Sequence, residues 1–282
     1  MRDLKGKGAV VTGAANGIGL GICRALAKAG VNIVLADIER DALERARAEI
    51  TTLGVQATAV PLDVSDRDAV MRTVSEVTRA LPKLHILVNN AGIAFHGSPL
   101  LSVEPEQWAW IWGVNVMGTI HCLNAFLPLI RAHGEGGHIV NTASIGGFQV
   151  NPVLRHGPYA MSKYAVVALS ETLALDFEGE RIGVSVFCPA LVASTLGQSA
   201  RRRPGQFGGA YEPPPSLRRH MPTGAITPDA AGARVLHAIE HDEFFVFTHP
   251  ETRQWIEARH RRIMAGFDAL DRYLAGQGRS VP

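Results

Sequence analysis

Apolar residues gather into short runs that alternate with stretches of helical periodicity along most of the chain. The runs cover residues 9–12, 32–36, 57–60, 84–88, 138–142 and 183–187. Apolar residues three or four positions apart follow them, as in Ile18, Ile22 and Leu26, and predict helices at about 18–29, 41–53, 65 onward, 104–130 and 158–178. This alternation predicts an α/β fold with a doubly wound parallel sheet and helices on both faces.

The end of the chain continues the pattern less regularly. A helix is predicted over residues 228–239 and a strand over 244–247, which brings the sheet to about seven strands. From about residue 251 to 275 apolar residues recur at helical spacing and predict an amphipathic helix, packed on the body or on another subunit. We expect residues 1–282 to form a single domain.

Residues 193–226 are dense in proline, glycine and arginine and have no clear periodicity. A linker is one interpretation. A lid over a binding site is the one we favour, because the segment follows a strand end. In a lid, Phe207 and Tyr211 would cover an apolar or aromatic substrate. We interpret the arginines at residues 201–203 as a solvated face rather than a carboxylate clamp.

Residues with functional side chains, or with special backbone requirements, fall at the carboxyl ends of the predicted strands. In a doubly wound sheet these ends lie along one edge, where ligands bind. The sequence therefore predicts one binding crevice. The residues in question are Gly13, Asp37, Asp63, Asn89, Ser144 and Pro189.

The first strand ends in a glycine-rich turn, Gly13-x-x-x-Gly17-Ile18-Gly19, that opens the first helix. Such a turn lets the backbone approach a pyrophosphate at the helix N-terminus, although it also occurs as an ordinary tight turn. Asp37 ends the second strand, where a carboxylate accepts hydrogen bonds from an adenosine ribose and repels a 2′-phosphate. Neither Asn16 nor Ile38 supplies a positive charge, and only Arg40 weakens the resulting preference for NAD over NADP.

The sequence allows two interpretations for each of two polar residues, Asp63 and Asn115. Asp63 either accepts the adenine amino group or is a turn or helix-cap carboxylate. Asn115 either is a buried amide satisfied locally or holds a water molecule in a proton path.

Tyr159 and Lys163 are four residues apart on a predicted helix and therefore share one face. A fixed ammonium would lower the pKa of the phenol from its ordinary value near 10. Ser144 would hold a substrate oxygen near that phenol. The same pair also arises by chance on amphipathic helices, so its meaning depends on the surrounding pattern.

Composition narrows the function further. Apolar residues make up 46% of the chain and the formal net charge is +2, which argues against nucleic acid and membrane surfaces as partners. No apolar signal core or membrane-spanning run is evident, and three widely spaced cysteines fit a reducing cytoplasm. We expect no metal site, and His121, His133 and His138 are interpreted as incidental.

Taken in order, these motifs resemble the short-chain dehydrogenase/reductase family in its single-domain form. The resemblance covers roughly residues 5 to 195 and implies a Rossmann-type doubly wound fold and hydride transfer between NAD and a secondary alcohol or ketone. The matching residues are Thr12, Gly13, Gly17, Ile18, Gly19, Asp37, Asp63, Val64, Asn89, Asn90, Ala91, Gly92, Asn115, Ser144, Tyr159 and Lys163.

Family membership would give each position a role. Tyr159 would be the general acid/base, and Ser144 would orient the substrate oxygen. Lys163 would lower the pKa of Tyr159 and bind the nicotinamide ribose. Asn115 would hold a water molecule. The cofactor would be bound by Gly13, Asn16, Gly17, Ile18, Gly19, Asp37, Asp63, Val64, Asn90, Ala91, Gly92, Tyr159, Lys163, Pro189, Val192 and Ser194. Homotetramers or homodimers are usual in the family.

The sequence departs from the family pattern in three places. Ser144 lies fifteen residues before Tyr159, whereas the family more often has thirteen, the position of Gly146; residues 151–156 would have to bulge for Ser144 to keep its role. Alanine follows Pro189 in place of glycine. Ser194, with Thr195 next to it, stands where a threonine is usual.

Within the family, the sequence resembles bacterial Cα-dehydrogenases of lignin-derived aryl ether dimers. The similar features are the residues at 112–115 and 137–140, the Arg-Pro pair at 203–204 and the long C-terminal helix. That resemblance implies a bulky aromatic secondary alcohol as substrate. The alternatives are a non-catalytic NAD(P)-sensing protein, an NADPH-dependent ketone reductase and a sugar-nucleotide epimerase or dehydratase of the extended type. The presence of both Tyr159 and Lys163 argues against a non-catalytic sensor. The short length of the chain argues against an epimerase or dehydratase of the extended type.

Overall fold

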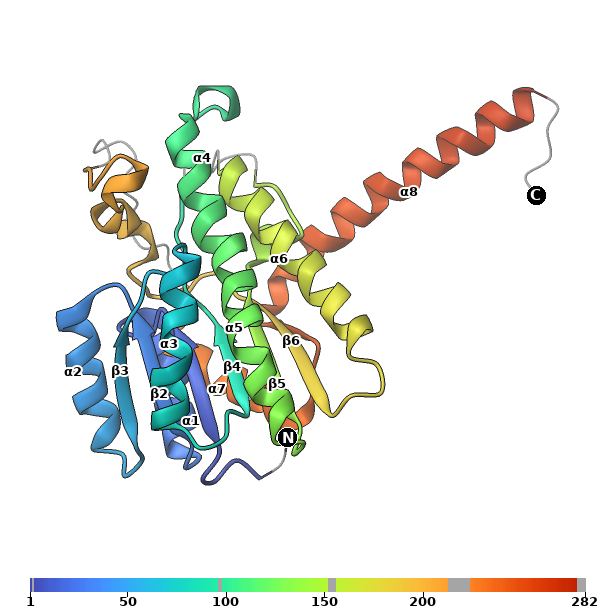
Figure 1. Ribbon diagram of the computed structural model, residues 1–282. Coiled ribbons are helices and arrows are strands. Elements are labelled where there is room, and N and C mark those ends of the chain that lie inside the picture. The colour runs from blue at the N-terminus through green and yellow to red at the C-terminus, as the bar shows by residue number, and fades with distance from the viewer. Residues whose placement is uncertain (2, 96–97, 152–155, 213–223, 278–282) are drawn as a thin grey trace. The chain divides into compact units, whose positions relative to one another are not determined.

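The computed structural model describes residues 1–282 with the exception of 2, 96–97, 152–155, 213–223 and 278–282. Contacts divide the chain into two compact units, Met1–Thr248 and His249–Pro282. The first unit holds the sheet and its helices, and the second holds the C-terminal helix (Figure 1). The predicted α/β fold is therefore confirmed for the first unit, and a single domain over residues 1–282 stays a prediction.

The sheet contains seven parallel strands in the order β3-β2-β1-β4-β5-β6-β7. β1 and β4 are neighbours although they are not consecutive, so the chain winds outward from β1 in two directions. In such sheets a ligand crevice forms at the carboxyl ends of the two strands where the winding reverses. The strands are β1 (Gly8–Thr12), β2 (Asn32–Asp37), β3 (Ala57–Pro61), β4 (Ile86–Asn89), β5 (Gly137–Thr142), β6 (Ile182–Cys188) and β7 (Phe245–Phe247).

Helices cover both faces of the sheet. Buried side chains of α3, α4 and α5 form one apolar cluster and those of α1, α2 and α7 form another. Figure 1 shows α3, α5 and α6 in front of the sheet and α1 and α7 behind it. The helices are α1 (Gly17–Lys28), α2 (Arg40–Thr51), α3 (Arg67–Ala80), α4 (Pro105–Trp112), α5 (Gly118–Ala132), α6 (Gly157–Asp176) and α7 (Pro228–His241).

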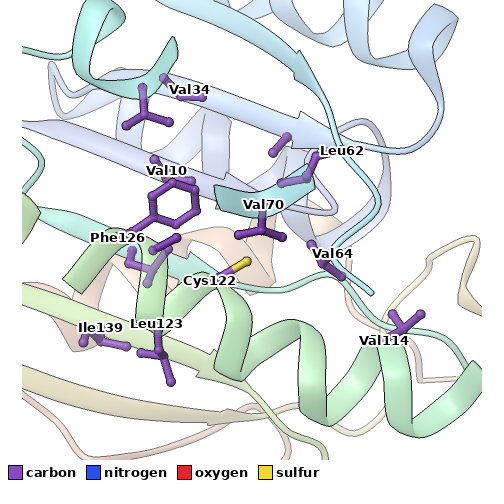
Figure 2. Close-up of a cluster of buried hydrophobic side chains, with 14 of the residues drawn as sticks. Val10, Val34, Leu62, Val64, Val70, Val114, Cys122, Leu123, Phe126 and Ile139 are labelled. Atoms are coloured by element: carbon purple, nitrogen blue, oxygen red, sulfur yellow. The ribbon is translucent and has the colours of Figure 1, made fainter. Parts of the chain in front are cut away.

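Successive residues of β1 supply the two clusters in turn, because side chains alternate between the faces of a sheet. Val10 belongs to the first cluster and its neighbours Ala9 and Val11 to the second. Figure 2 shows Phe126 of α5 beside Val10 in the first cluster. This double burial explains why the strands appear in the sequence as continuous apolar runs.

The helix predicted over residues 104–130 is built from three pieces. α4 and α5 are joined by η2, a π-helical segment over Gly113–Met117. The continuous stretch Pro105–Ala132 is long and apolar enough to cross a membrane, contrary to the expectation that no run reaches that length. However, 61% of its apolar window is buried inside the protein, as is usual for a core helix.

The segment predicted as a lid has little regular structure in its described part. Short 3-10 turns form at η4 (Leu196–Arg202) and η5 (Gly205–Phe207), and Val192 forms an isolated parallel bridge with Ile226. Residues 213–223 of the predicted lid lie outside the described part of the chain. Two further 3-10 turns, η1 (Leu100–Ser102) and η3 (Ile145–Gly147), precede α4 and α6.

The C-terminal unit consists mainly of one long helix. It begins with the turn η7 (Pro250–Thr252) and continues as α8 (Arg253–Gly276). The helix predicted over about 251–275 is thus confirmed, while the surface on which it packs stays a prediction.

Candidate active site

The glycine-rich turn after β1 has a backbone that only glycine tolerates. Gly13 and Gly17 have φ values of +64° and +52°, in the left-handed region that side chains disfavour. A Cβ atom on Gly19 would collide with the carbonyl oxygen of Gly13. The turn therefore leaves backbone N–H groups at the N-terminus of α1 open to a close approach, which suits a phosphate group.

Residues at the end of β4 brace this turn. Asn90 donates side-chain hydrogen bonds to the carbonyl oxygens of Thr12 (3.0 Å) and Gly13 (3.2 Å). The backbone N–H groups of Asn90 and Ala91 both donate to Oγ1 of Thr12 at 3.0 Å. The cofactor wall predicted at Asn90 and Ala91 is thus joined to the glycine-rich turn at the crevice between β1 and β4.

Asp37 lies at the tip of β2, as predicted, and faces the same turn. One carboxylate oxygen accepts the N–H of Ala15 at 2.9 Å and the other accepts the N–H of Glu39 at 3.0 Å. Burial raises the pKa of Asp37 above its ordinary value, while these two hydrogen bonds act in the opposite direction.

Of the arginines at residues 201–203, Arg201 is exposed, but Arg202 and Arg203 are only partly exposed and do not belong to the solvated face that the sequence suggested. Nε of Arg202 lies 2.6 Å from a carboxylate oxygen of Glu39, and Arg201 lies 3.7 Å from the other oxygen. The guanidinium of Arg203 stacks over the rings of Trp110 and Tyr211. The interpretation was wrong because ion pairs between segments far apart in the chain leave no local pattern.

The loop after β3 contains the Asp63–Val64 pair. Oδ1 of Asp63 accepts hydrogen bonds from the backbone and hydroxyl of Ser65 at 2.9 and 2.7 Å, so the turn interpretation holds for that oxygen. Nδ1 of His121 lies 3.0 Å from the carbonyl oxygen of Val64. His121 thus helps to fix this loop, and an adenine contact by Asp63 stays a prediction.

Ser144 follows β5 and caps the short turn η3. Its hydroxyl oxygen accepts the N–H of Gly146 at 3.1 Å and lies 3.5 Å from the carbonyl oxygen of Pro189. It also shares a hydrogen bond with the hydroxyl of Tyr159. Ser144 thus reaches the phenol despite its unusual spacing; residues 152–155, in the stretch expected to bulge, lie outside the described part.

Tyr159 and Lys163 lie on the first two turns of α6, and the ammonium is 5.7 Å from the centre of the phenol ring. Lys163 is only 4% exposed, and its ammonium donates to the carbonyl oxygen of Thr142 at 2.8 Å. Burial lowers the pKa of Lys163 to about 8. Burial also raises the pKa of Tyr159, so the lowering expected from the ammonium is not what the structure shows.

Asn115 occupies the π-helical segment η2 and is buried. Its amide oxygen accepts the N–H of Ile93, and its amide nitrogen donates to Ile93 O and to the hydroxyl of Ser162 at 3.0 and 2.9 Å. Ser162 in turn donates to the carbonyl oxygen of Tyr159 at 2.7 Å. The local-satisfaction interpretation therefore holds, and a bound water molecule stays a prediction.

The lid segment contains one residue predicted to bind the cofactor, Ser194, and two predicted to contact the substrate, Phe207 and Tyr211. Ser194 packs close to Gly17 of the glycine-rich turn. Phe207 lies against Gly113, and Tyr211 hydrogen-bonds Gln107 of α4. These contacts place Phe207 and Tyr211 over α4, and no described contact joins them to Tyr159.

Two clusters of histidine and glutamate have their ligand atoms within metal-binding distance in the described residues, which the sequence spacing did not reveal. In the cluster of His85, His133 and Glu135, the glutamate pairs with Lys7, Lys83 and His85, and both nitrogens of His133 have backbone partners. The second cluster, His237, Glu240 and His241, lies at the end of α7. Both lie outside the set of residues around Tyr159.

The site therefore joins a phosphate-binding turn, an acidic strand tip and a Ser-Tyr-Lys group along one sheet edge. Such a set can bind a dinucleotide and transfer a proton to or from a substrate oxygen. Sequence reasoning missed Glu39 and Arg202, for which no sequence signal exists, and Ser162, which stands within the Tyr159–Lys163 motif itself.

Comparison with known proteins supports this arrangement. Residues 7–205 match the family model described as short chain dehydrogenase. The C alpha-dehydrogenase of Sphingobium sp. strain SYK-6 is 32% identical over 269 residues, which is 94% of this chain and 87% of the relative. The 1-deoxy-11-beta-hydroxypentalenate dehydrogenase of Streptomyces exfoliatus is 34% identical over 251 residues, 89% of this chain and 86% of the relative.

Solved structures with a similar fold include members of the same family. A short chain dehydrogenase/reductase from Burkholderia phymatum in complex with NAD has a TM-score of 0.88 at 33% identity, covering 94% of this chain and 97% of that one. The apo form of LigD from Sphingobium sp. strain SYK-6 has a TM-score of 0.78 at 30% identity, covering 93% and 98%. With its fold, its glycine-rich turn and its Ser-Tyr-Lys group in place, the chain belongs to the short-chain dehydrogenase/reductase family.

Proposed function

We propose that this protein is an NAD-dependent oxidoreductase that interconverts a secondary alcohol and a ketone, with Tyr159 as general acid/base. The observation that carries the proposal is the hydrogen bond between Ser144 and Tyr159, with the buried ammonium of Lys163 on the same helix face. A protein that only binds a dinucleotide has no need of a phenol held between a hydroxyl and an ammonium.

The crevice fits a nicotinamide dinucleotide. Gly13, Gly17 and Gly19 form a cradle that side chains would fill, at the positive end of α1. Asp37 offers a carboxylate for the ribose hydroxyls. When bound, the nicotinamide supplies the hydride acceptor or donor for the reaction.

The proton path runs through residues of this chain. In the direction of alcohol oxidation, Ser144 hydrogen-bonds the substrate oxygen and Tyr159 takes the hydroxyl proton as hydride leaves the carbon. Because burial raises the pKa of Tyr159, the free phenol is protonated at neutral pH. The positive charges of Lys163 and of the oxidised nicotinamide ring favour the phenolate and so promote the oxidation.

NAD is the favoured cofactor because two carboxylates, Asp37 and Glu39, lie at the tip of β2 and repel a 2′-phosphate. Arg202 neutralises Glu39 but leaves both oxygens of Asp37 on backbone N–H groups. We therefore expect NAD to be used more efficiently than NADP.

A bulky aromatic or otherwise apolar secondary alcohol is the proposed substrate. The support is the similarity over 94% of the chain to a C alpha-dehydrogenase, together with Phe207, Tyr211 and Trp110 on and under the lid segment. We further propose a cytoplasmic homotetramer or homodimer built on the helices α4–α5 and α6, where Met117, Met161 and Leu175 are exposed.

The experiment is a screen of the purified protein for NADH formation with bulky aromatic, steroidal and aliphatic secondary alcohols. Turnover with an aromatic alcohol and NAD, at higher kcat/KM than with NADP, is the expected result. NADH binding without turnover of any alcohol would instead identify a non-catalytic sensor. Light scattering on the same sample gives the oligomeric state.

A further inference from the structure

The described part of the lid segment is tied to the tip of β2 through Glu39, which pairs with Arg202 and, at 3.7 Å, with Arg201. Nε of Arg202 in η4 lies 2.6 Å from Oε1 of Glu39, and the Arg202 side chain is 19% exposed. A second nitrogen of Arg202 donates to Oγ1 of Thr195 at 2.7 Å, which anchors the guanidinium within the lid. Burial lowers the pKa of Arg202 while Glu39 opposes that change, as expected for a partly desolvated pair.

Glu39 is shared between the lid and the glycine-rich turn. Nδ2 of Asn16 donates to the same oxygen, Oε1, at 3.1 Å. A few residues before Arg202, the side chain of Ser194 packs against Gly17. The lid thus touches both sides of the adenosine half of the crevice, the phosphate-binding turn at Gly17 and the ribose-binding tip beside Asp37.

The far side of the lid has a separate anchor that does not involve the cofactor crevice. Arg203 stacks over Trp110 of α4 and over Tyr211, with 5.8 and 5.5 Å to the ring centres. The two adjacent arginines therefore hold the lid segment to two different elements, Arg202 to the tip of β2 through an ion pair and Arg203 to α4 through the ring of Trp110. Among the described residues, the pairs of Arg201 and Arg202 with Glu39 join the lid segment to the tip of β2 beside Asp37.

We propose that Glu39 and Arg202 form a latch that holds the described part of the lid segment, residues 193–212, over the adenosine half of the bound dinucleotide, so that NADH leaves only after this ion pair opens. The proposal rests on the proposed NAD-dependent function. A partly buried pair in a low-dielectric setting contributes more than an exposed surface pair. The latch makes Glu39 and Arg202 determinants of cofactor residence time, in addition to the ribose contact expected of Asp37.

The test is stopped-flow displacement of bound NADH by excess NAD, followed by NADH fluorescence. Glu39→Gln keeps an oxygen acceptor for Asn16 and removes only the charge, and Arg202→Gln removes the other partner. We expect each variant to release NADH about tenfold faster, equivalent to about 1.4 kcal/mol. The double variant should release it no faster than either single one, because the two residues act as a unit.

A matched control is Glu44→Gln with Arg47→Gln, which breaks an exposed ion pair of 2.7 Å on α2. These variants should leave NADH release unchanged. Raising the salt concentration should speed release from the wild type and not from the double variant.

A second readout is independent of the cofactor. Trypsin cleaves after arginine, so cleavage at the Arg201–Arg202 bond should be faster in Glu39→Gln than in the wild type. NADH release at the wild-type rate in Glu39→Gln, or rates that multiply in the double variant, would overturn the latch and leave the enzyme assignment intact. A wild-type protein that binds no NADH would overturn both.

Discussion

The buried side chain of His138 should lower the free energy of unfolding at acid pH. The size of this loss follows from the surroundings of the imidazole. The side chain is 1% exposed in β5, and its Nε2 lies 2.8 Å from the hydroxyl of Ser185. That hydroxyl donates to the carbonyl oxygen of Glu243, so it accepts from Nε2, which must carry a hydrogen, while Nδ1 lies 3.6 Å from a carboxylate oxygen of Asp242. Burial lowers the pKa of His138 to about 4.

The sign follows from which state binds the proton first. An unfolded histidine titrates near 6.5, so between that pH and about 4 only the unfolded state gains the proton. The stability from His138 is therefore complete above about pH 6.5 and is lost as the pH falls toward 4. At about 1.36 kcal/mol per pH unit, the interval of about 2.5 units corresponds to a loss of about 3 kcal/mol.

Urea unfolding of the wild type and His138→Gln, at pH values from about 7.5 down to about 4, measures this term. Glutamine retains an N–H donor for Ser185 but does not titrate, so the variant should lose about 3 kcal/mol less over the same interval. His260→Gln, on the exposed surface of α8, is the control and should follow the wild type. Equal losses in the wild type and His138→Gln would refute the assignment.

Three further predictions concern the site and the packing around it. Ser144→Ala should lower kcat by about 10²-fold with little change in NAD affinity, as measured by steady-state kinetics and NADH titration; a kcat near the wild-type value would remove Ser144 from the reaction. Asp37→Ala should raise KM for NAD by about tenfold and change KM for NADP less, whereas an unaltered preference would show that Asp37 does not face the ribose. Gly232→Ala would push a Cβ into the carbonyl of Gly21 where α7 crosses α1, and should lower the free energy of unfolding by about 1–3 kcal/mol. The control is Gly266→Ala on α8, where a Cβ meets open space and the free energy of unfolding should stay equal or rise.

Much of this architecture was predictable because the inner strands of the sheet are buried on both faces and the helices that cover the sheet bury one face. The runs at residues 9–12 and 32–36, for example, became β1 and β2 with ends shifted by a single residue. The positions of Gly13, Asp37 and Ser144 at strand ends followed from parallel topology alone. The pair Tyr159 and Lys163 followed from the period of a helix.

What could not be predicted depends on contacts between distant segments. The π-helical segment η2 is stabilised where Asn115 bonds Ile93, and no helix signal in the local sequence marks it. The Glu39–Arg202 ion pair likewise joins segments that carry no shared pattern. The proximity of Ser144 to Tyr159 could be seen only in the structure, because the spacing usual in the family falls on Gly146.

The raised pKa of Tyr159 likewise could not be predicted from the sequence. From the sequence, the ammonium four residues away was expected to lower it. Burial of both groups is a property of the folded chain, and in the structure it outweighs that effect. In the proposed mechanism, the positive charge of the oxidised cofactor therefore adds to that of Lys163 in favouring the phenolate of Tyr159.

The central claim is that Tyr159 transfers the proton that accompanies hydride transfer, and Tyr159→Phe tests it most directly. The measurement is the rate of NADH formation with the best alcohol from the screen, together with the NADH dissociation constant of the same protein. We predict a fall in rate of at least about 10³-fold with a dissociation constant within about twofold of the wild type. A variant that binds NADH normally and keeps more than about a tenth of the wild-type rate would contradict the account.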